Sequence, residues 1–143
     1  MLSHPRSGSG YMAKLFQSAG YDVGHEKVGK HGISSWLMAV YDPPVWTFDH
    51  KRRDEYKFKT TIQIIREPIP AISSIALTES ASVNFRSRYV LMYGNLIERA
   101  VMSYIGWNKL IQSQSPNYVW QLENAHKSLS SLLNKKNTSI RTL

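Results

Sequence analysis

The sequence predicts an α/β fold built on a parallel β-sheet flanked by helices. Short segments typical of strands alternate with longer segments of helical periodicity along the 143 residues, and strands that alternate with helices usually pair in parallel. The strongest strand is expected over Thr60–Ile65, where Thr-Thr-Ile-Gln-Ile-Ile is rich in β-branched residues and too short for a helix. The length suits one domain with its own core, which we expect to span residues 1–143.

Glycine and proline divide the first half of the chain into short elements. Residues 1–4 predict a strand that leads into a turn rich in Gly and Ser. A helix is expected over 11–19, because its apolar residues fall on one side and Gly20 is a stop signal. A second strand over 21–24 and a second helix over 33–40 follow, and a Pro-Pro pair ends that helix.

Two helices of the second half are predicted by proline and by periodicity. Pro70 is well placed to start a helix through Leu77, since proline is favoured in the first helical turn. A long helix is expected over 87–112, where apolar residues recur at helical spacing. The remaining segments are expected to be a polar loop over 79–86, a strand over 118–122, a last helix over 125–133 and a frayed tail over 134–143.

Composition favours an anionic partner and excludes cysteine chemistry. Lys and Arg number 18 against 10 acidic residues, a formal charge of +8, which suits a nucleotide, a nucleic acid, a sulfated sugar or a membrane surface. A sequence without cysteine has no disulfides, thiolate zinc sites or cysteine nucleophiles, and we expect no metal. No segment reaches the roughly 18 apolar residues of a membrane span. Because Pro5 and Arg6 stand where a secretory signal would be apolar, we expect a cytoplasmic protein.

The segment Pro5-Arg6-Ser7-Gly8-Ser9-Gly10-Tyr11 predicts an anion-binding loop. It lies between a predicted strand and a predicted helix, where glycines let backbone N–H groups approach oxygens and the helix dipole favours negative charge. Arg6 adds a fixed positive charge, and Ser7 and Ser9 add hydroxyl donors. No Gly-Lys-Ser/Thr closes the segment, so a Mg-dependent NTPase of the Walker A type is disfavoured. An ordinary Gly/Ser turn before a helix is the alternative.

A second basic motif follows the strand over 60–65. It reads Arg66-Glu67-Pro68, and Ser74 stands eight residues after Arg66. Together the two motifs resemble the sulfotransferase family that uses 3'-phosphoadenosine-5'-phosphosulfate (PAPS). In that family a Pro-Lys/Arg-Ser-Gly-Thr/Ser loop binds the 5'-phosphosulfate, while an Arg-(Asp/Glu)-Pro arginine and a later serine bind the 3'-phosphate.

The resemblance implies a three-layer P-loop-like fold and a nucleotide site. By this resemblance the donor would be bound by Arg6, Ser7, Gly8, Ser9, Gly10, Tyr11, Arg66 and Ser74. The loop departs from the common family pattern at Gly10-Tyr11, where Thr-Trp or Thr-Tyr is frequent, so one hydroxyl donor is missing there.

Transfer of a sulfuryl group also needs charge stabilisation and a base. The resemblance implies that Arg6 neutralises charge on the bridging oxygen. Glu26 is the first candidate for the base, because it directly follows the second predicted strand, at the edge of the sheet that carries the phosphate loop. His25 is adjacent but is expected to point the other way, and His31 and His50 are in reserve.

The expected function is transfer of the sulfuryl group of PAPS to a hydroxyl or amine acceptor. The chain is short beside most members of the family, so a domain that binds the nucleotide without catalysing transfer is one alternative. A nucleic-acid-binding module is another, although no such motif is recognisable. A kinase of similar topology would lack its Walker lysine. For Glu26 the structural alternative is an ion pair with Lys27 or Lys30.

Overall fold

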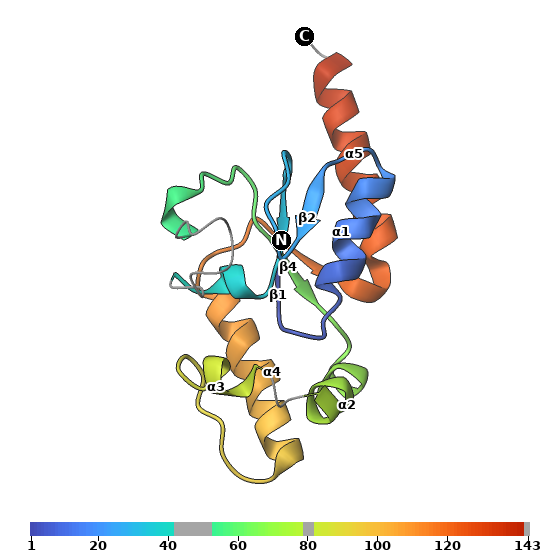
Figure 1. The fold of residues 1–143 in the computed structure, drawn as a ribbon. Helices are drawn as coiled ribbons and strands as arrows, with labels where there is room; N and C mark the ends of the chain where they lie inside the picture. Colours follow the sequence, from blue (N-terminus) through green and yellow to red (C-terminus); the bar gives the residue numbers. More distant parts are fainter. Residues whose placement is uncertain (42–52, 79–81, 142–143) are drawn as a thin grey trace.

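Parallel strands and the helices between them organise the chain in the computed structural model, which describes residues 1–41, 53–78 and 82–141 (Figure 1). The strands are β1 (Leu2–Ser3), β2 (Val23–His25), β3 (Gly32–Ser34), β4 (Ile62–Ile65) and β5 (Tyr118–Gln121). The α-helices are α1 (Ser9–Ser18), α2 (Pro68–Thr78), α3 (Val83–Arg86), α4 (Leu96–Gln112) and α5 (Ala125–Arg141). Short 3-10 helices are η1 (Leu37–Ala39), η3 (Arg53–Glu55) and η5 (Leu122–Asn124).

All strand pairs that the structure describes in these ladders are parallel. One sheet has the order β1-β4-β5, and β2 pairs with β3 in a second ladder. A parallel bridge between Leu2 and Ser35 joins the two ladders, and Ser35 N donates to Met1 O at 3.0 Å. The strands therefore follow one another as β2-β3-β1-β4-β5. The predicted α/β class with a parallel sheet flanked by helices is confirmed.

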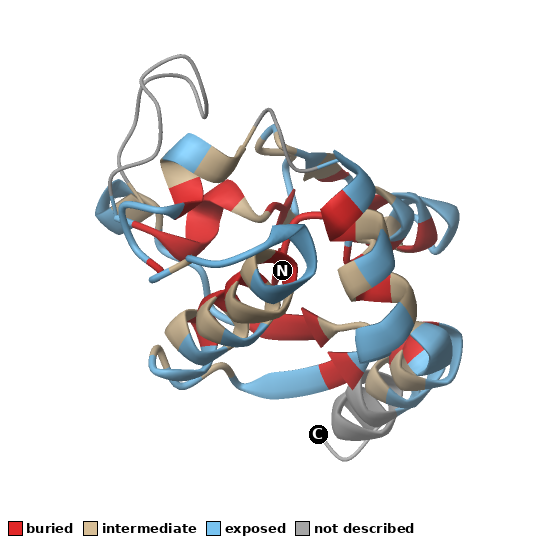
Figure 2. Ribbon diagram, turned by 90° about the horizontal axis from the view of Figure 1, so that it is seen from below, coloured by how far each residue is buried: buried red, intermediate tan, exposed pale blue. Residues whose placement is uncertain are grey.

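Helices cover both faces of the sheet. Met12 of α1 and Leu129 of α5 pack with Ile64 and Trp120 on one face. On the other face, Trp107 of α4 and the η1 segment pack with residues of β1 and β3, and α2 packs on α4. The buried residues are concentrated along β1, β3 and β4 and on the helix surfaces that face them, whereas β5 at the edge of the sheet is mostly exposed (Figure 2).

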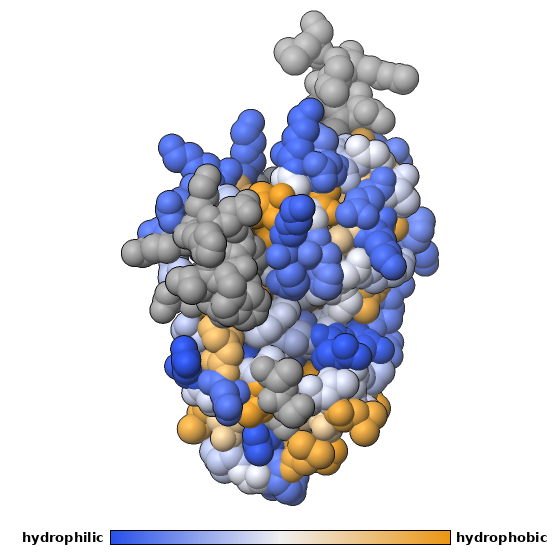
Figure 3. Space-filling view, viewed as in Figure 1, coloured by the Kyte–Doolittle hydropathy of each residue, from blue (hydrophilic) through white to orange (hydrophobic). Residues whose placement is uncertain are grey.

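Exposed apolar side chains gather at the end of the molecule where α2 and the start of α4 lie (Figure 3). They include Ile69, Leu77, Leu91, Leu96 and Ile97. The surface beside α2 is thus more apolar than most of the face shown in that view, where hydrophilic side chains predominate.

The helix expected over 33–40 is wrong. Ile33 and Ser34 belong to β3, where Ile33 pairs with Gly24 of β2, and only η1 is helical in this segment. A short apolar run fits a buried strand as well as a helix, and here pairing with β2 decides the outcome.

The long helix expected over 87–112 is wrong in its first part. Its helical part, α4, begins only at Leu96, because Gly94 has φ 86° and Asn95 forms a capping box with Glu98. The expected polar loop before it contains α3, which ends at the buried Arg86; residues 79–81 lie outside the described ranges.

The last helix, α5, continues beyond its expected end at Leu133 to Arg141. Residues 134–141 contain neither glycine nor proline, so no helix-ending residue interrupts the segment.

Candidate functional site

The loop after β1 turns sharply into the start of α1. Arg6 and Gly8 both have positive φ, at 68° and 86°, and Gly8 is the N-cap of α1 without a side chain that could cap it. The first helical hydrogen bond runs from Met12 N to Gly8 O at 2.9 Å, so the N–H groups of Ser9 and Gly10 point out of the helix end. The partial positive charge of such an end favours an anion.

Two serine hydroxyls and a histidine surround this helix start. Ser7 is fully buried, and its Oγ has no hydrogen-bond partner among the described residues. Ser9 Oγ lies 3.0 Å from His25 Nε2. A Cβ atom at Gly10 would lie 3.4 Å from His25 Cε1, so the imidazole packs on the first turn of α1, while Tyr11 is half-exposed. The Ser7 hydroxyl is thus a buried polar group whose donor is not used by any described residue.

The second basic motif meets the first one at this loop. Arg66 directly follows β4, and its Nη1 donates to Arg6 O at 3.0 Å. The Nε of Arg6 in turn donates to Ser74 Oγ on α2 at 3.1 Å. Tyr104 OH on α4 donates to Arg66 O at 2.5 Å and so holds the backbone that carries the second arginine. Two segments 60 residues apart therefore place both arginines and Ser74 in one cluster.

The topology of the sheet explains why these segments meet. β1 and β4 are parallel neighbours, so the loops that follow them leave the same edge of the sheet. The chain runs from β1 through α1 towards β2, and from β4 through α2 and α4 towards β5 on the opposite side. Ligands of open parallel sheets bind in the crevice where successive connections diverge in this way.

His25 ends β2 at this edge and Glu26 follows it, but their orientations are opposite to those expected. The expectation that His25 points away is wrong, because its Nε2 reaches Ser9 Oγ. Glu26 has the left-handed φ of 51°. Its carboxylate accepts hydrogen bonds from two residues that follow β3, from Ser35 Oγ and from Trp36 N at 3.2 Å.

The electrostatics of this pair follow from its position. Glu26 Oε1 lies 3.7 Å from His25 Nε2, and the two side chains are 24% and 50% exposed. Burial raises the pKa of Glu26, and the hydrogen bonds from Ser35 and Trp36 oppose this shift. The imidazole is therefore the more accessible of the two groups, and the carboxylate lies behind it.

His31, one of the two reserve histidines, lies outside this cluster. His31 precedes β3, at the edge of the sheet where the strands begin, and its Nδ1 accepts the N–H of Asp22 at 2.8 Å. It packs edge-on against Tyr21 with ring centroids 5.8 Å apart. The sequence position of His50 lies outside the described residues.

Behind the loop lies a buried polar network whose residues were not among those predicted from the sequence. His4 is fully buried, its Nδ1 lies 2.5 Å from Pro5 O and its Nε2 lies 2.8 Å from Ser103 Oγ. A carbonyl can only accept, so Nδ1 carries the proton and Nε2 accepts from the Ser103 hydroxyl. Arg86, which is 1% exposed, donates to the same Oγ, and its Nη1 also lies 3.3 Å from His4 Nε2.

This network fixes the first residues of the loop to α3 and α4. Burial lowers the pKa of His4 to about 3, with the charge of Arg86 acting in the same direction and the Pro5 carbonyl against it. The histidine is thus neutral at neutral pH, as its acceptor role requires. His4 directly precedes the loop motif, so its position in the sequence is a signal that could have identified it. Nothing near Arg86 in the sequence indicates a partner 82 residues away.

The described parts of the chain contain neither a cluster of metal ligands nor a candidate membrane span. No three His, Asp or Glu side chains in those ranges gather where they could hold a metal ion. No helix there is both long and apolar enough to cross a membrane.

Comparison with protein-family models, with curated proteins and with solved structures finds no match to this chain. What the site can do therefore follows from its own geometry and chemistry.

Proposed function

We propose that this chain is a sulfotransferase that moves the sulfuryl group of PAPS to a hydroxyl or amine acceptor, on a three-layer P-loop-like fold. The observation that carries the proposal is the cluster in which Arg66 donates to Arg6 O and Arg6 donates to Ser74 Oγ. These are the residues that the resemblance assigns to the two phosphate-binding motifs, and they lie at the edge of a parallel sheet where nucleotides bind.

The residues at this edge suit a nucleotide with two phosphate groups. The uncapped start of α1 suits the phosphosulfate end, with Arg6 as a cation of the same loop. Arg66 and Ser74 suit the 3'-phosphate. When bound, PAPS supplies the sulfuryl group and a phosphate leaving group, so the protein contributes mainly positioning and charge stabilisation.

The geometry favours His25 as the group that takes the acceptor proton, with Glu26 as the residue that positions it. His25 Nε2 reaches the loop at Ser9 and remains half-exposed, whereas both carboxylate oxygens of Glu26 already accept hydrogen bonds. A base must lie within hydrogen-bond reach of the proton it removes, and His25 meets this condition more directly than Glu26, the first candidate from the sequence.

Donor binding is tested by calorimetry with adenosine 3',5'-bisphosphate, the nucleotide product of such a transfer. We expect saturable binding that Arg66→Ala weakens at least about 10-fold, because a charge-assisted hydrogen bond is worth about 1.5–3 kcal/mol. Lys109→Ala is the matched control, since this exposed residue of α4 lies outside the cluster. Absence of binding by the unmodified chain would overturn the proposal.

Catalysis is tested by transfer of labelled sulfate from PAPS to panels of hydroxyl and amine acceptors. We expect His25→Gln to lower kcat/KM by about 10²–10⁴-fold. We expect Glu26→Gln to have a smaller effect and to shift the pH dependence of kcat. Full loss in Glu26→Gln with activity retained in His25→Gln would reverse the two roles. If the chain binds the bisphosphate but transfers sulfate to no acceptor, the proposed donor site stands and the proposed transferase activity is refuted.

A further inference from the structure

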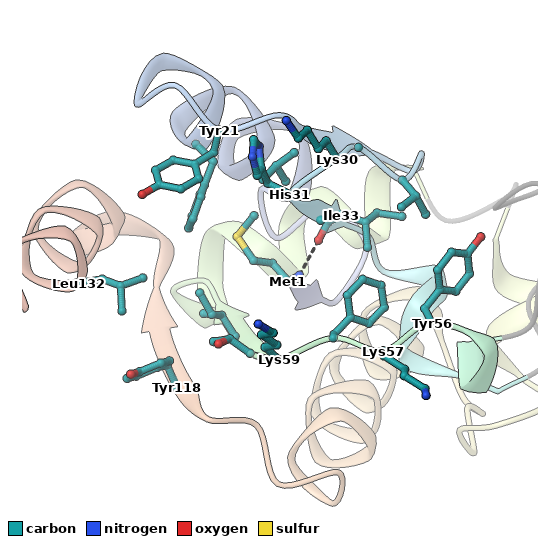
Figure 4. Close-up of a pocket in the computed structure, with 18 of the residues that line it drawn as sticks. Met1, Tyr21, Lys30, His31, Ile33, Tyr56, Lys57, Lys59, Tyr118 and Leu132 are labelled. Carbon is teal, nitrogen blue, oxygen red and sulfur yellow. Dashed lines mark hydrogen bonds between the residues drawn. The ribbon is translucent and has the colours of Figure 1, made fainter. Parts of the chain in front are cut away.

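A cavity of about 860 Å³ opens at the edge of the sheet opposite the phosphate loop (Figure 4). Met1 precedes β1, and Val23, Gly32, Ile62 and Tyr118 are the first residues of the other four described strands; all five line the cavity. Because the strands are parallel, their first residues share one edge, and the nucleotide cluster lies at the other. The cavity is therefore separate from the site of the proposed function.

The walls of this cavity carry several aromatic rings. Phe16 and Tyr21 meet with centroids 6.1 Å apart on the side of α1. On the side of the segment before β4, Tyr56 and Phe58 stack at 5.7 Å with nearly parallel planes. Phe58 is 40% exposed. Such rings offer flat apolar surface to a ligand that enters between them.

Positive charge surrounds the apolar walls. Lys30 lies on one side of the opening, and Lys57 and Lys59 lie on the other (Figure 4). All three lysines are exposed. The described lining includes no Asp or Glu. The amino group of Met1 donates a hydrogen bond to Ile33 O at 2.5 Å. The lysines therefore give the opening a net positive charge that no lining carboxylate balances.

We propose that this cavity binds a drug-sized organic anion with a flat apolar body, such as an aryl carboxylate or aryl sulfonate. The apolar body lies between the two aromatic pairs, and the anionic group meets Lys30, Lys57 and Lys59. The volume falls within the range of small-molecule sites, which combine mostly apolar walls with a few polar groups that fix orientation. The charge of the rim distinguishes an anionic ligand from a neutral one of the same shape.

The experiment uses two fluorescent probes of similar shape and different charge, added to the full chain. 8-Anilinonaphthalene-1-sulfonate carries one negative charge, and N-phenyl-1-naphthylamine carries none. The test variant replaces the three rim lysines by glutamine, and the control variant makes the same three changes at exposed lysines outside the cavity: Lys14, Lys109 and Lys127. Both variants have the same net charge, so a general electrostatic effect would appear equally in each.

We expect the sulfonate to bind one-to-one with micromolar affinity and to be weakened about 5- to 20-fold by the rim substitutions, since each exposed charge contributes modestly. The neutral probe should change less than about 2-fold in that variant. Phe58→Ala should weaken both probes, because it removes apolar wall and no charge. Cooperative thermal unfolding of each variant establishes that it is folded.

Four results would overturn the proposal. They are absence of saturable sulfonate binding, binding to many weak sites, an equal loss in the control variant, and displacement of the sulfonate by adenosine 3',5'-bisphosphate. Displacement would place the probe in the nucleotide cluster. The proposal does not depend on the transferase function, because binding at this cavity is read without donor or acceptor.

Discussion

Replacing Gly8 by alanine tests whether the loop between β1 and α1 requires a residue without a side chain. Gly8 has φ 86°, and a Cβ atom added there would lie 2.5 Å from Leu122 Cδ1. A left-handed backbone costs an alanine about 1–2 kcal/mol, and an extra methyl group in a packed place costs about 1–3 kcal/mol more. We therefore expect Gly8→Ala to lower the free energy of unfolding by about 2–5 kcal/mol.

Gly20 provides the matched control for this substitution. Its φ is 84°, and no described atom lies within 4 Å of the Cβ that alanine would add. Gly20→Ala should therefore lose only the backbone part, about 1–2 kcal/mol. Equilibrium denaturation in urea, followed by tryptophan fluorescence, measures both values. Introducing Gly8→Ala into a Leu122→Ala background separates the contact from the backbone conformation.

If Gly8→Ala and Gly20→Ala lower the free energy of unfolding equally, the predicted clash between the added Cβ and Leu122 is refuted. A loss below about 0.5 kcal/mol at both positions would refute the requirement for a left-handed backbone. The affinity for adenosine 3',5'-bisphosphate gives a second measurement. If Gly8→Ala displaces the start of α1, we expect this affinity to fall even where the variant remains folded.

Three further predictions concern the surroundings of the site. Removing the buried donor with Arg86→Met should lower the free energy of unfolding by about 2–4 kcal/mol, because the Ser103 and His4 network loses its donor; an unchanged urea midpoint would contradict this. The folded protein keeps His4 neutral down to a pKa of about 3, whereas an unfolded histidine is protonated below about 6.5. The unfolded state therefore binds more protons between these values, and the free energy of unfolding should fall as the pH drops through this window. His4→Gln should flatten that slope in urea titrations, and a retained slope would assign it to another group. Asn95→Ala removes the capping box with Glu98 and should lower stability by about 1 kcal/mol in thermal unfolding, while an unchanged melting temperature would show that the cap is dispensable.

Local signals account for the parts of the fold that the sequence predicted. The β-branched run of β4 and the helix expected from Pro70 through Leu77 could be read from neighbouring residues. Both are present, although α2 begins at Pro68, two residues earlier than expected. The start of α4 also had a local signal, since Asn95 with Glu98 three residues later is the pattern of a capping box. Apolar residues at helical spacing continue before Asn95, and for this reason the predicted helix started too early. Gly94, with its positive φ, prevents the helix from extending to these earlier residues.

Contacts between distant segments account for the parts that could not be predicted. The β3 strand forms because Ile33 finds a partner in β2, which no periodicity within residues 33–40 reveals. The direction of His25 depends on the left-handed turn at Glu26 and on the position of Ser9. The placement of Arg86 behind the loop depends on tertiary packing alone. The proximity of Arg6 and Arg66, in contrast, follows from strand order once β1 and β4 are neighbours.

Ser35 joins the halves of the sheet and also holds the proposed positioning carboxylate. Its N–H donates to Met1 O across the junction between the two ladders, and its hydroxyl donates to Glu26. The β2–β3 ladder, which carries His25, is thus attached to the β1–β4–β5 sheet at the same residue that sets the carboxylate behind His25. We expect a change in the angle between the ladders to move the Ser35 side chain, and with it the Glu26 carboxylate that lies 3.7 Å from the imidazole. Hydrogen exchange at the Ser35 amide would report how often the hydrogen bond from Ser35 N to Met1 O opens.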